Sequence, residues 1–94
     1  MATPEELLDE VVDRDTFVAF VNVLAAEREQ AAKIEQANPQ AYGVDGALGW
    51  KNAGIAAFLY ASLDYFNEKP CHLPDPEPSW RMFAEFLYHG KIIE

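Results

Sequence analysis

The side chains of this sequence that could do chemistry are one thiol, two imidazoles and several carboxylates. Cys71 and His72 are adjacent, and His89 lies further along the chain. A metal site needs three or four ligands at workable spacing, and a thiol nucleophile needs a histidine distant in sequence but close in space. No C-x-x-C or H-x-x-x-H pattern is present. We therefore expect a thiol and an imidazole packed under a loop, with no metal or cofactor.

Two further acidic patterns have a chemical and a structural interpretation. Glu85 and His89 lie four residues apart on one helical face, which is half of a metal site or a general-base pair, but no third group is identifiable. Asp75 and Glu77 alternate with prolines. Extended P-x-P segments dock into aromatic grooves, yet the same prolines also stiffen a connection, which is the favoured interpretation. We expect no enzyme; a small hydrolase or metal-dependent enzyme is the third alternative, and it would use Cys71, His72, Glu85 or His89.

The elements that position these groups are helices, and the sequence predicts where each helix begins. Thr3 and Pro4 predict a short first helix over 3–12, because threonine caps helices and proline suits the first turn. Asp13 predicts the start of a second helix that runs to about Gln36. Asn52 and Ser79 predict the caps of a third and a fourth helix. The fold class expected is all-α, a single domain over residues 1–94 with a bundle of three to four helices.

Each long helix carries apolar residues at helical spacing. The expected core stripes are Phe17, Phe20, Val21 and Leu24; Ile55, Phe58, Leu59, Ser62 and Phe66, widened by Leu63; and Trp80, Phe83, Ala84 and Leu87. Gly90 is expected as the residue just past the fourth helix. The four residues after it are apolar enough to dock onto the core.

Two connections interrupt the helices. Residues 38–52 contain Gly43, Gly46 and Gly49 and are long for a structureless loop, so the loop is either packed or functional. Residues 70–78 contain four prolines and are expected to be extended. Trp50 in the first loop either anchors an interface or plugs the core, and packing is favoured because Leu48 accompanies it.

Charge limits the partners. Sixteen Asp and Glu residues against seven Lys and Arg give a net charge of −9, which disfavours direct binding of nucleic acid or an anionic membrane. Half of the residues are hydrophobic, so the chain is not a disordered acidic tail. No apolar run is long enough to span a membrane, and the first residues lack the positive charge of a signal peptide. We expect a cytoplasmic protein.

The acids concentrate at the start of the chain, where Glu5, Glu6, Asp9, Glu10, Asp13 and Asp15 crowd the first fifteen residues. Such a surface favours a basic partner and speeds its encounter. The candidate partner-binding residues are Tyr42, Trp50, Asp9, Glu10 and Asp13.

The C-terminal run Ser79-Trp-Arg-Met-Phe-Ala-Glu-Phe-Leu-Tyr-His-Gly-Lys-Ile-Ile-Glu94 resembles the closing motif S-W-x-x-F-A-x-x-L-x-x-x-K-I-Y-E of a family of small uncharacterised bacterial proteins. Residues 15–21 and 41–52 are similar to that family too, so the resemblance covers most of the chain, although Ile93 stands where tyrosine is commoner. The resemblance implies a bacterial helical domain of unknown function and no catalytic residues.

These patterns favour a small acidic protein–protein interaction module, with an immunity-like protein that neutralises a basic partner as one version. The second alternative is a structural homodimer, in which the apolar stripes exceed what one core of 94 residues can bury. The function itself stays unknown from the sequence.

Overall fold

The computed structural model describes residues 2–42, 45–67 and 78–93. Within these residues, four α-helices follow one another: α1 (Pro4–Leu8), α2 (Arg14–Ala37), α3 (Ile55–Asn67) and α4 (Trp80–Ile92), with a short 3₁₀ turn, η1 (Ala47–Gly49), between α2 and α3. The described residues contain no strand. The prediction of an all-α fold with three to four helices is confirmed.

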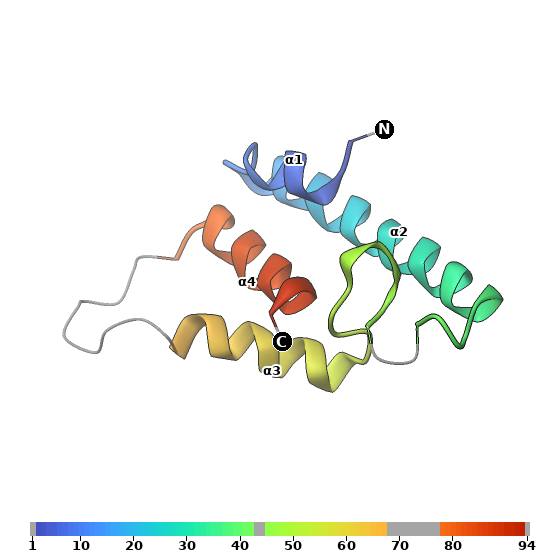
Figure 1. Cartoon of the computed structure of the whole chain (residues 1–94). Helices are drawn as coiled ribbons and strands as arrows, with labels where there is room; N and C mark the ends of the chain where they lie inside the picture. Colours follow the sequence, from blue (N-terminus) through green and yellow to red (C-terminus); the bar gives the residue numbers. More distant parts are fainter. Residues whose placement is uncertain (1, 43–44, 68–77, 94) are drawn as a thin grey trace.

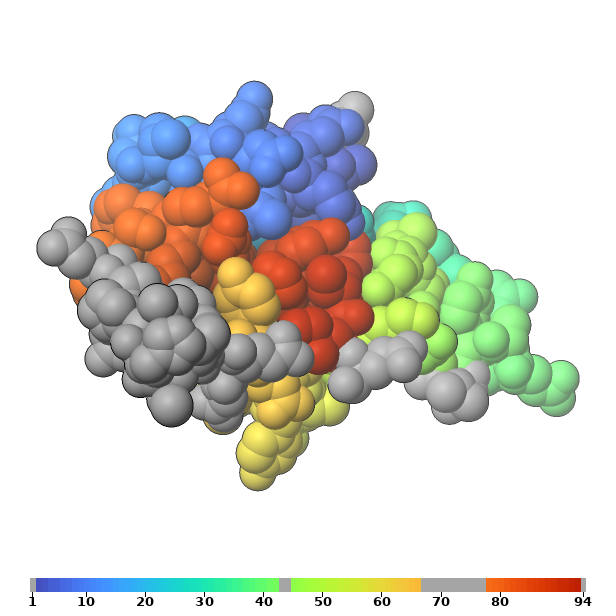
Figure 2. Space-filling model, turned by 60° about the vertical axis from the view of Figure 1, so that its left-hand side comes forward, coloured from blue at the N-terminus to red at the C-terminus, as the bar shows by residue number. Residues whose placement is uncertain are grey.

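The helix α4 occupies the centre of the fold. It contacts α1 and α2 on one side and α3 on the other (Figure 1). Figure 2 shows the start of α2, in blue, directly against the first half of α4, in orange, where the rings of Phe17 and Trp80 lie 5.3 Å apart. Among the described residues, α4 is the only helix with which α3 makes extensive contact. As a result, one long side of α3 has none of the described helices packed on it.

Three of the predicted helix caps form. The Oγ1 of Thr3 accepts a hydrogen bond from the N–H of Glu6 at 3.2 Å, and the Oγ of Ser79 accepts one from the N–H of Met82 at 3.0 Å. Asp13 caps α2 in a reciprocal box with Thr16. These side chains satisfy donors that the first helical turn leaves free, so the starts of α1, α2 and α4 follow from local sequence.

The prediction for Asn52 is wrong. The helix α3 begins three residues later, at Ile55, and the Asn52 side chain instead donates to the backbone carbonyls of Gly90 and Ile93. Asn52 therefore ties the loop to the end of α4, a tertiary role that a capping rule does not detect.

The prediction for Gly90 is also wrong, because α4 continues through it to Ile92. A Cβ atom at Gly90 would collide with the Oγ of Ser62 and lie 2.9 Å from the ring of Phe58. Glycine therefore serves here as the point of closest approach between α4 and α3. Ser62 itself is fully buried, and its hydroxyl donates a hydrogen bond to the backbone carbonyl of Phe58 at 3.1 Å.

The core lies between α2, the loop and α4. Its fully or nearly fully buried members are Val11, Phe20, Leu24, Ala31, Ala47, Trp50 and Ala84. The predicted stripe on α2 supplies Phe20 and Leu24, and Ala84 comes from the predicted stripe on α4. Trp80 and Phe83, expected in the core, remain 38% and 42% exposed.

The predicted core stripe on α3 is wrong in part. Phe58 and Phe66 are half-buried and Ser62 is fully buried, but Ile55 is 80% exposed and Leu59 and Leu63 are each 46% exposed. The physical reason is that α3 is apolar around most of its circumference, so its sequence does not determine which side faces α4.

Candidate functional site

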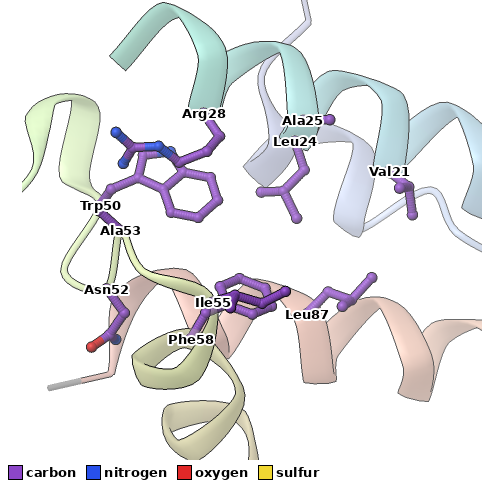
Figure 3. Close-up of a pocket in the computed structure, with 10 residues that line it drawn as sticks. All are labelled: Val21, Leu24, Ala25, Arg28, Trp50, Asn52, Ala53, Ile55, Phe58 and Leu87. Atoms are coloured by element: carbon purple, nitrogen blue, oxygen red, sulfur yellow. The ribbon is translucent and has the colours of Figure 1, made fainter. Parts of the chain in front are cut away.

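The described part of the chain has a groove between α2 and α3, with a volume of about 280 Å³. In Figure 3 the α2 side chains lie along one edge, Leu87 of α4 and Phe58 of α3 lie opposite them, and the loop around Trp50 closes one end. The lining is almost entirely apolar and consists of Val21, Leu24, Ala25, Arg28, Trp50, Asn52, Ala53, Ile55, Phe58 and Leu87. Its size suits a few apolar side chains of a partner better than a large cofactor.

Trp50 is the wall at the closed end of the groove. It is only 3% exposed, and its ring stacks on Phe58 with centroids 6.0 Å apart. Its Nε1 donates a hydrogen bond to the Oε1 of Glu27 at 3.0 Å. A buried indole needs such an acceptor, so Glu27 is what permits Trp50 to pack inward. Of the two interpretations of Trp50, an interface anchor or a core residue, the second describes its position.

Arg28 is the one charged residue among those that line the groove. Its guanidinium lies 5.2 Å from the centre of the Trp50 ring, and its Nη2 donates to the Oε1 of Glu35 at 2.6 Å. That hydrogen bond holds the pKa of Glu35 below its usual value, although partial burial acts in the opposite direction. The second Glu35 oxygen accepts the N–H of Ala47 at 2.8 Å, which fixes the loop against α2. Arg28 therefore supplies the charge of the groove and, through Glu35, also holds the loop in place.

Behind Trp50, Lys91 forms the centre of a buried ion cluster. The residue is 2% exposed, and its Nζ lies 2.6 Å from Glu27 Oε1 and 2.9 Å from Glu5 Oε1. The ammonium also lies 5.8 Å from the centre of the Trp50 ring, within reach of a cation–π contact. One side chain thus joins α4 to α1, α2 and the loop.

The cluster shifts two pKa values. Burial alone would lower the pKa of Lys91, but the hydrogen bonds to Glu27 and Glu5 outweigh it and raise the pKa above 10.5. Burial alone would raise the pKa of Glu5, but the hydrogen bonds that its carboxylate accepts, that from Lys91 foremost, together with the charge of Lys91 outweigh burial and lower the pKa below 4.5. Both shifts favour the charged forms, which is the behaviour of a structural ion pair.

The predicted chemical pair Glu85 and His89 does not form a side-chain dyad. The Nδ1 of His89 lies 2.7 Å from the backbone carbonyl of Glu85, while the Glu85 carboxylate accepts from Tyr65 Oη and Arg81 Nε, each at 3.2 Å. The His89 ring stacks on Tyr65 at 3.7 Å. Burial and the neighbouring Glu85 raise the pKa of Tyr65. This arrangement is a packed contact between α3 and α4.

The other predicted chemical residues, Cys71, His72, Asp75 and Glu77, lie outside the described residues. Within the described residues, no group of three or more His, Cys, Asp or Glu side chains could hold a metal ion.

The five candidate partner-binding residues fall into two separate groups. Tyr42 is half-buried and packs, like Trp50, on the core beside the second half of α2. Asp9, Glu10 and Asp13 are exposed around the start of α2. Trp50 contacts Glu27, fourteen residues after Asp13 on the same helix, which places the groups about 21 Å apart. They do not form one site.

The three acids differ in their partners. Asp9 pairs with Arg81 at 3.2 Å. The Asp13 carboxylate, which caps α2, accepts a hydrogen bond from the N–H of Thr16, and this bond lowers the pKa of the carboxyl. Glu10 is exposed and makes no ion pair with a described residue. The free charge of this edge therefore resides mainly in Glu10 and its exposed neighbour Glu6.

Reasoning from sequence missed two features. Lys91 and Glu27 carry the buried ion cluster, yet a lysine and a glutamate more than sixty positions apart give no local signal. The exposed apolar surface of α3 had a signal, because the helix carries apolar residues on more than one face.

No protein-family model, curated protein or solved structure matches the chain. The resemblance of residues 79–94 to small bacterial proteins therefore stays a prediction. No helix in the part of the chain that the structure describes is long and apolar enough to cross a membrane.

Proposed function

We propose that this protein is a small protein–protein interaction module that binds through the apolar surface of α3 and the groove beside it. The observation that carries the proposal is the exposure of Ile55 (80%), Leu59 (46%) and Leu63 (46%) along one helix. Single exposed apolar residues are ordinary, but a contiguous patch is typical of an interaction site.

The groove is continuous with the exposed apolar surface of α3 and supports the same proposal. Ile55 belongs both to its lining and to the exposed residues of α3. A partner segment that covers α3 would therefore also reach Leu87 and Phe58 inside the groove. Apolar side chains in a preformed pocket with a polar rim are the usual centre of a protein interface.

A specific observation supports the version with a basic partner. Glu6 and Glu10 are exposed on the N-terminal edge, and neither makes an ion pair with a described residue. In a chain of net charge −9, free carboxylates at one edge attract a cationic partner and speed its approach, more strongly at low salt.

Site-specific photo-crosslinking in the cells that make the protein tests the proposal. A photoreactive side chain in place of Leu59 is expected to crosslink to a protein. The matched control replaces Lys33, an exposed residue of α2, and is expected to give no product of the same mass. Equal labelling at both positions, or none at Leu59, would contradict the proposal.

A Glu6→Gln, Glu10→Gln variant separates the two surfaces. If the partner is basic, the variant binds it more slowly at low salt and equally well at high salt. Loss of binding that is independent of salt would argue against the electrostatic version.

A further inference from the structure

Three aromatic rings form an exposed cluster where the starts of α2 and α4 meet (Figure 2). The ring of Phe17 lies 5.3 Å from that of Trp80 and 6.4 Å from that of Phe83, and the rings of Trp80 and Phe83 are 6.0 Å apart. Trp80 and Phe83 nevertheless remain 38% and 42% exposed. None of the three residues belongs to α3 or lines the groove, so the aromatic cluster is a separate surface.

The two tryptophans of the chain differ in their contacts. Arg28 and Lys91 both lie beside the ring of Trp50, and the Trp50 indole N–H donates to Glu27. Among the described residues, no cation lies over the ring of Trp80 and no acceptor binds its indole N–H. A half-exposed tryptophan whose ring face and N–H are both free is typical of a contact residue.

Carboxylates border the aromatic cluster on the side of α1 and α2. Asp13 lies one helical turn before Phe17, whose N–H donates to the Asp13 carbonyl at 3.0 Å. Its exposed carboxylate uses only Oδ1 in the helix cap. Asp9 lies against the first turn of α4, because its Oδ1 pairs at 3.2 Å with Arg81, the residue after Trp80. The Oδ2 atoms of both aspartates thus have no hydrogen bond to a described residue.

The charge around the cluster stays negative when the described cations nearby are counted. The carboxylates are Asp9, Glu10, Asp13, Asp15 and Glu85, and the cations are Arg14 and Arg81. With the positive ends of α2 and α4 counted at about half a charge each, the balance is about two negative charges. The chain as a whole carries −9, so a cation is attracted both at long range and at the cluster.

We propose that the aromatic cluster, together with Asp9 and Asp13, is a second contact surface that binds an arginine side chain in a basic segment of a partner protein. Two different properties select this chemistry, because the face of an aromatic ring attracts a cation and a carboxylate pairs with it. Arginine fits both better than lysine, since its planar guanidinium stacks on a ring while its N–H groups bind a carboxylate. The inference goes beyond the proposed function, because α3 contributes nothing to this surface.

Nuclear magnetic resonance of the isotope-labelled full chain tests the site directly, because the two tryptophans give separate indole N–H signals. Trp80→Phe assigns them, and the probe is a peptide of alternating glycine and arginine. During the titration we expect the signal of Trp80 to move and the signal of the buried Trp50 to stay. A Trp80 signal that stays at millimolar peptide, or a Trp50 signal that moves as far, would overturn the inference.

A lysine peptide of the same length and charge separates stacking from charge alone. Calorimetry should show that the arginine peptide binds about two- to fivefold more tightly, as expected of an exposed cation–π contact. Trp80→Leu keeps an apolar side chain without an aromatic ring and should abolish this preference, with unchanged far-UV circular dichroism. Equal affinities of the wild type for both peptides would overturn the assignment to arginine.

A matched pair of variants tests the carboxylate. Serine caps a helix about as well as aspartate, so Asp13→Ser removes the charge and keeps the start of α2. The control is Glu29→Gln, because Glu29 is also exposed and lies about 24 Å further along α2, or about three Debye lengths at physiological salt. Asp13→Ser should weaken binding of the arginine peptide about threefold, and Glu29→Gln should leave it unchanged. Equal losses would mean that the peptide responds to net charge alone and would overturn the inference.

This test and photo-crosslinking at Leu59 fail separately. Crosslinking at Leu59 without a response of Trp80 would refute the arginine site and leave the proposed function intact. A response of Trp80 without crosslinking at Leu59 would refute the proposed function and leave the arginine site intact.

Discussion

Replacing Lys91 with methionine is the sharpest test of the buried ion cluster. Methionine retains the unbranched stem of lysine but removes the ammonium that contacts Glu27 at 2.6 Å and Glu5 at 2.9 Å. Removing one partner of a buried ion pair costs about 3–5 kcal/mol because it leaves an uncompensated charge. Glu27 is 18% exposed and retains the Trp50 indole as a donor. We therefore expect a loss of about 3 kcal/mol.

The double variant Glu27→Gln, Lys91→Met isolates the cause of that loss. Glutamine still accepts the hydrogen bond from Trp50 Nε1, and no buried charge remains unpaired. The double variant should therefore be more stable than Lys91→Met alone, by about 1–2 kcal/mol, whereas independent sites would simply add their losses.

Urea unfolding followed by far-UV circular dichroism measures both variants. With an m-value of about 1 kcal/mol/M for a chain of this size, Lys91→Met should lower the midpoint by about 3 M. A change under about 0.5 kcal/mol for Lys91→Met would refute the reasoning, since it would mean that the ammonium is not buried. So would a double variant as unstable as the sum of the single changes.

Three further outcomes are expected. Gly90→Ala should cost about 1–3 kcal/mol in thermal unfolding because its Cβ meets Ser62 and Phe58. Gly54→Ala, with no atom within 4 Å of the new Cβ, loses only the preference for glycine over alanine at the start of α3 and should cost less than about 1 kcal/mol. Equal losses would contradict the close approach of α4 and α3. Ser79→Ala should lower the free energy of unfolding by about 1 kcal/mol because it removes the cap of α4. The urea midpoint measures this loss, and an unchanged midpoint would disprove it. The pKa of Glu5 is lowered in the folded state, so the stability that its carboxylate contributes is complete above pH 4.5 and is lost as the pH falls through the lowered pKa. Glu5→Gln should therefore flatten this part of a plot of unfolding free energy against pH. An unchanged slope would show that Glu5 does not belong to the cluster.

The sequence predicted the parts of the fold that depend on neighbouring residues. Thr3, Asp13 and Ser79 cap helices within their own first turn, so local rules found all three. Asn52 and Gly90 satisfy the same local rules, yet each is used in a contact between distant segments. Capping and stop signals therefore predict a boundary only where no tertiary contact competes for the residue.

The candidate site was harder to predict for a different reason. Trp50 lies in a loop rich in glycine, and its inward position depends on Glu27, on another element. The orientation of α3 depends on which of two apolar stripes α4 covers, and Gly90 decides it by admitting Phe58 and Ser62 at close range. Pairings of this kind connect residues that no single periodic pattern contains.

The ion cluster at Lys91 also affects the order in which the chain can fold. The contact between Glu5 and Lys91 joins positions that are far apart in the sequence, and such contacts form late because long loops must close first. During synthesis the N-terminal helix α1 emerges well before α4, the helix on which it packs. The first helices therefore have no complete core until residues 80–92 have been made, so we expect folding to follow their synthesis and to make α1 the last helix to dock.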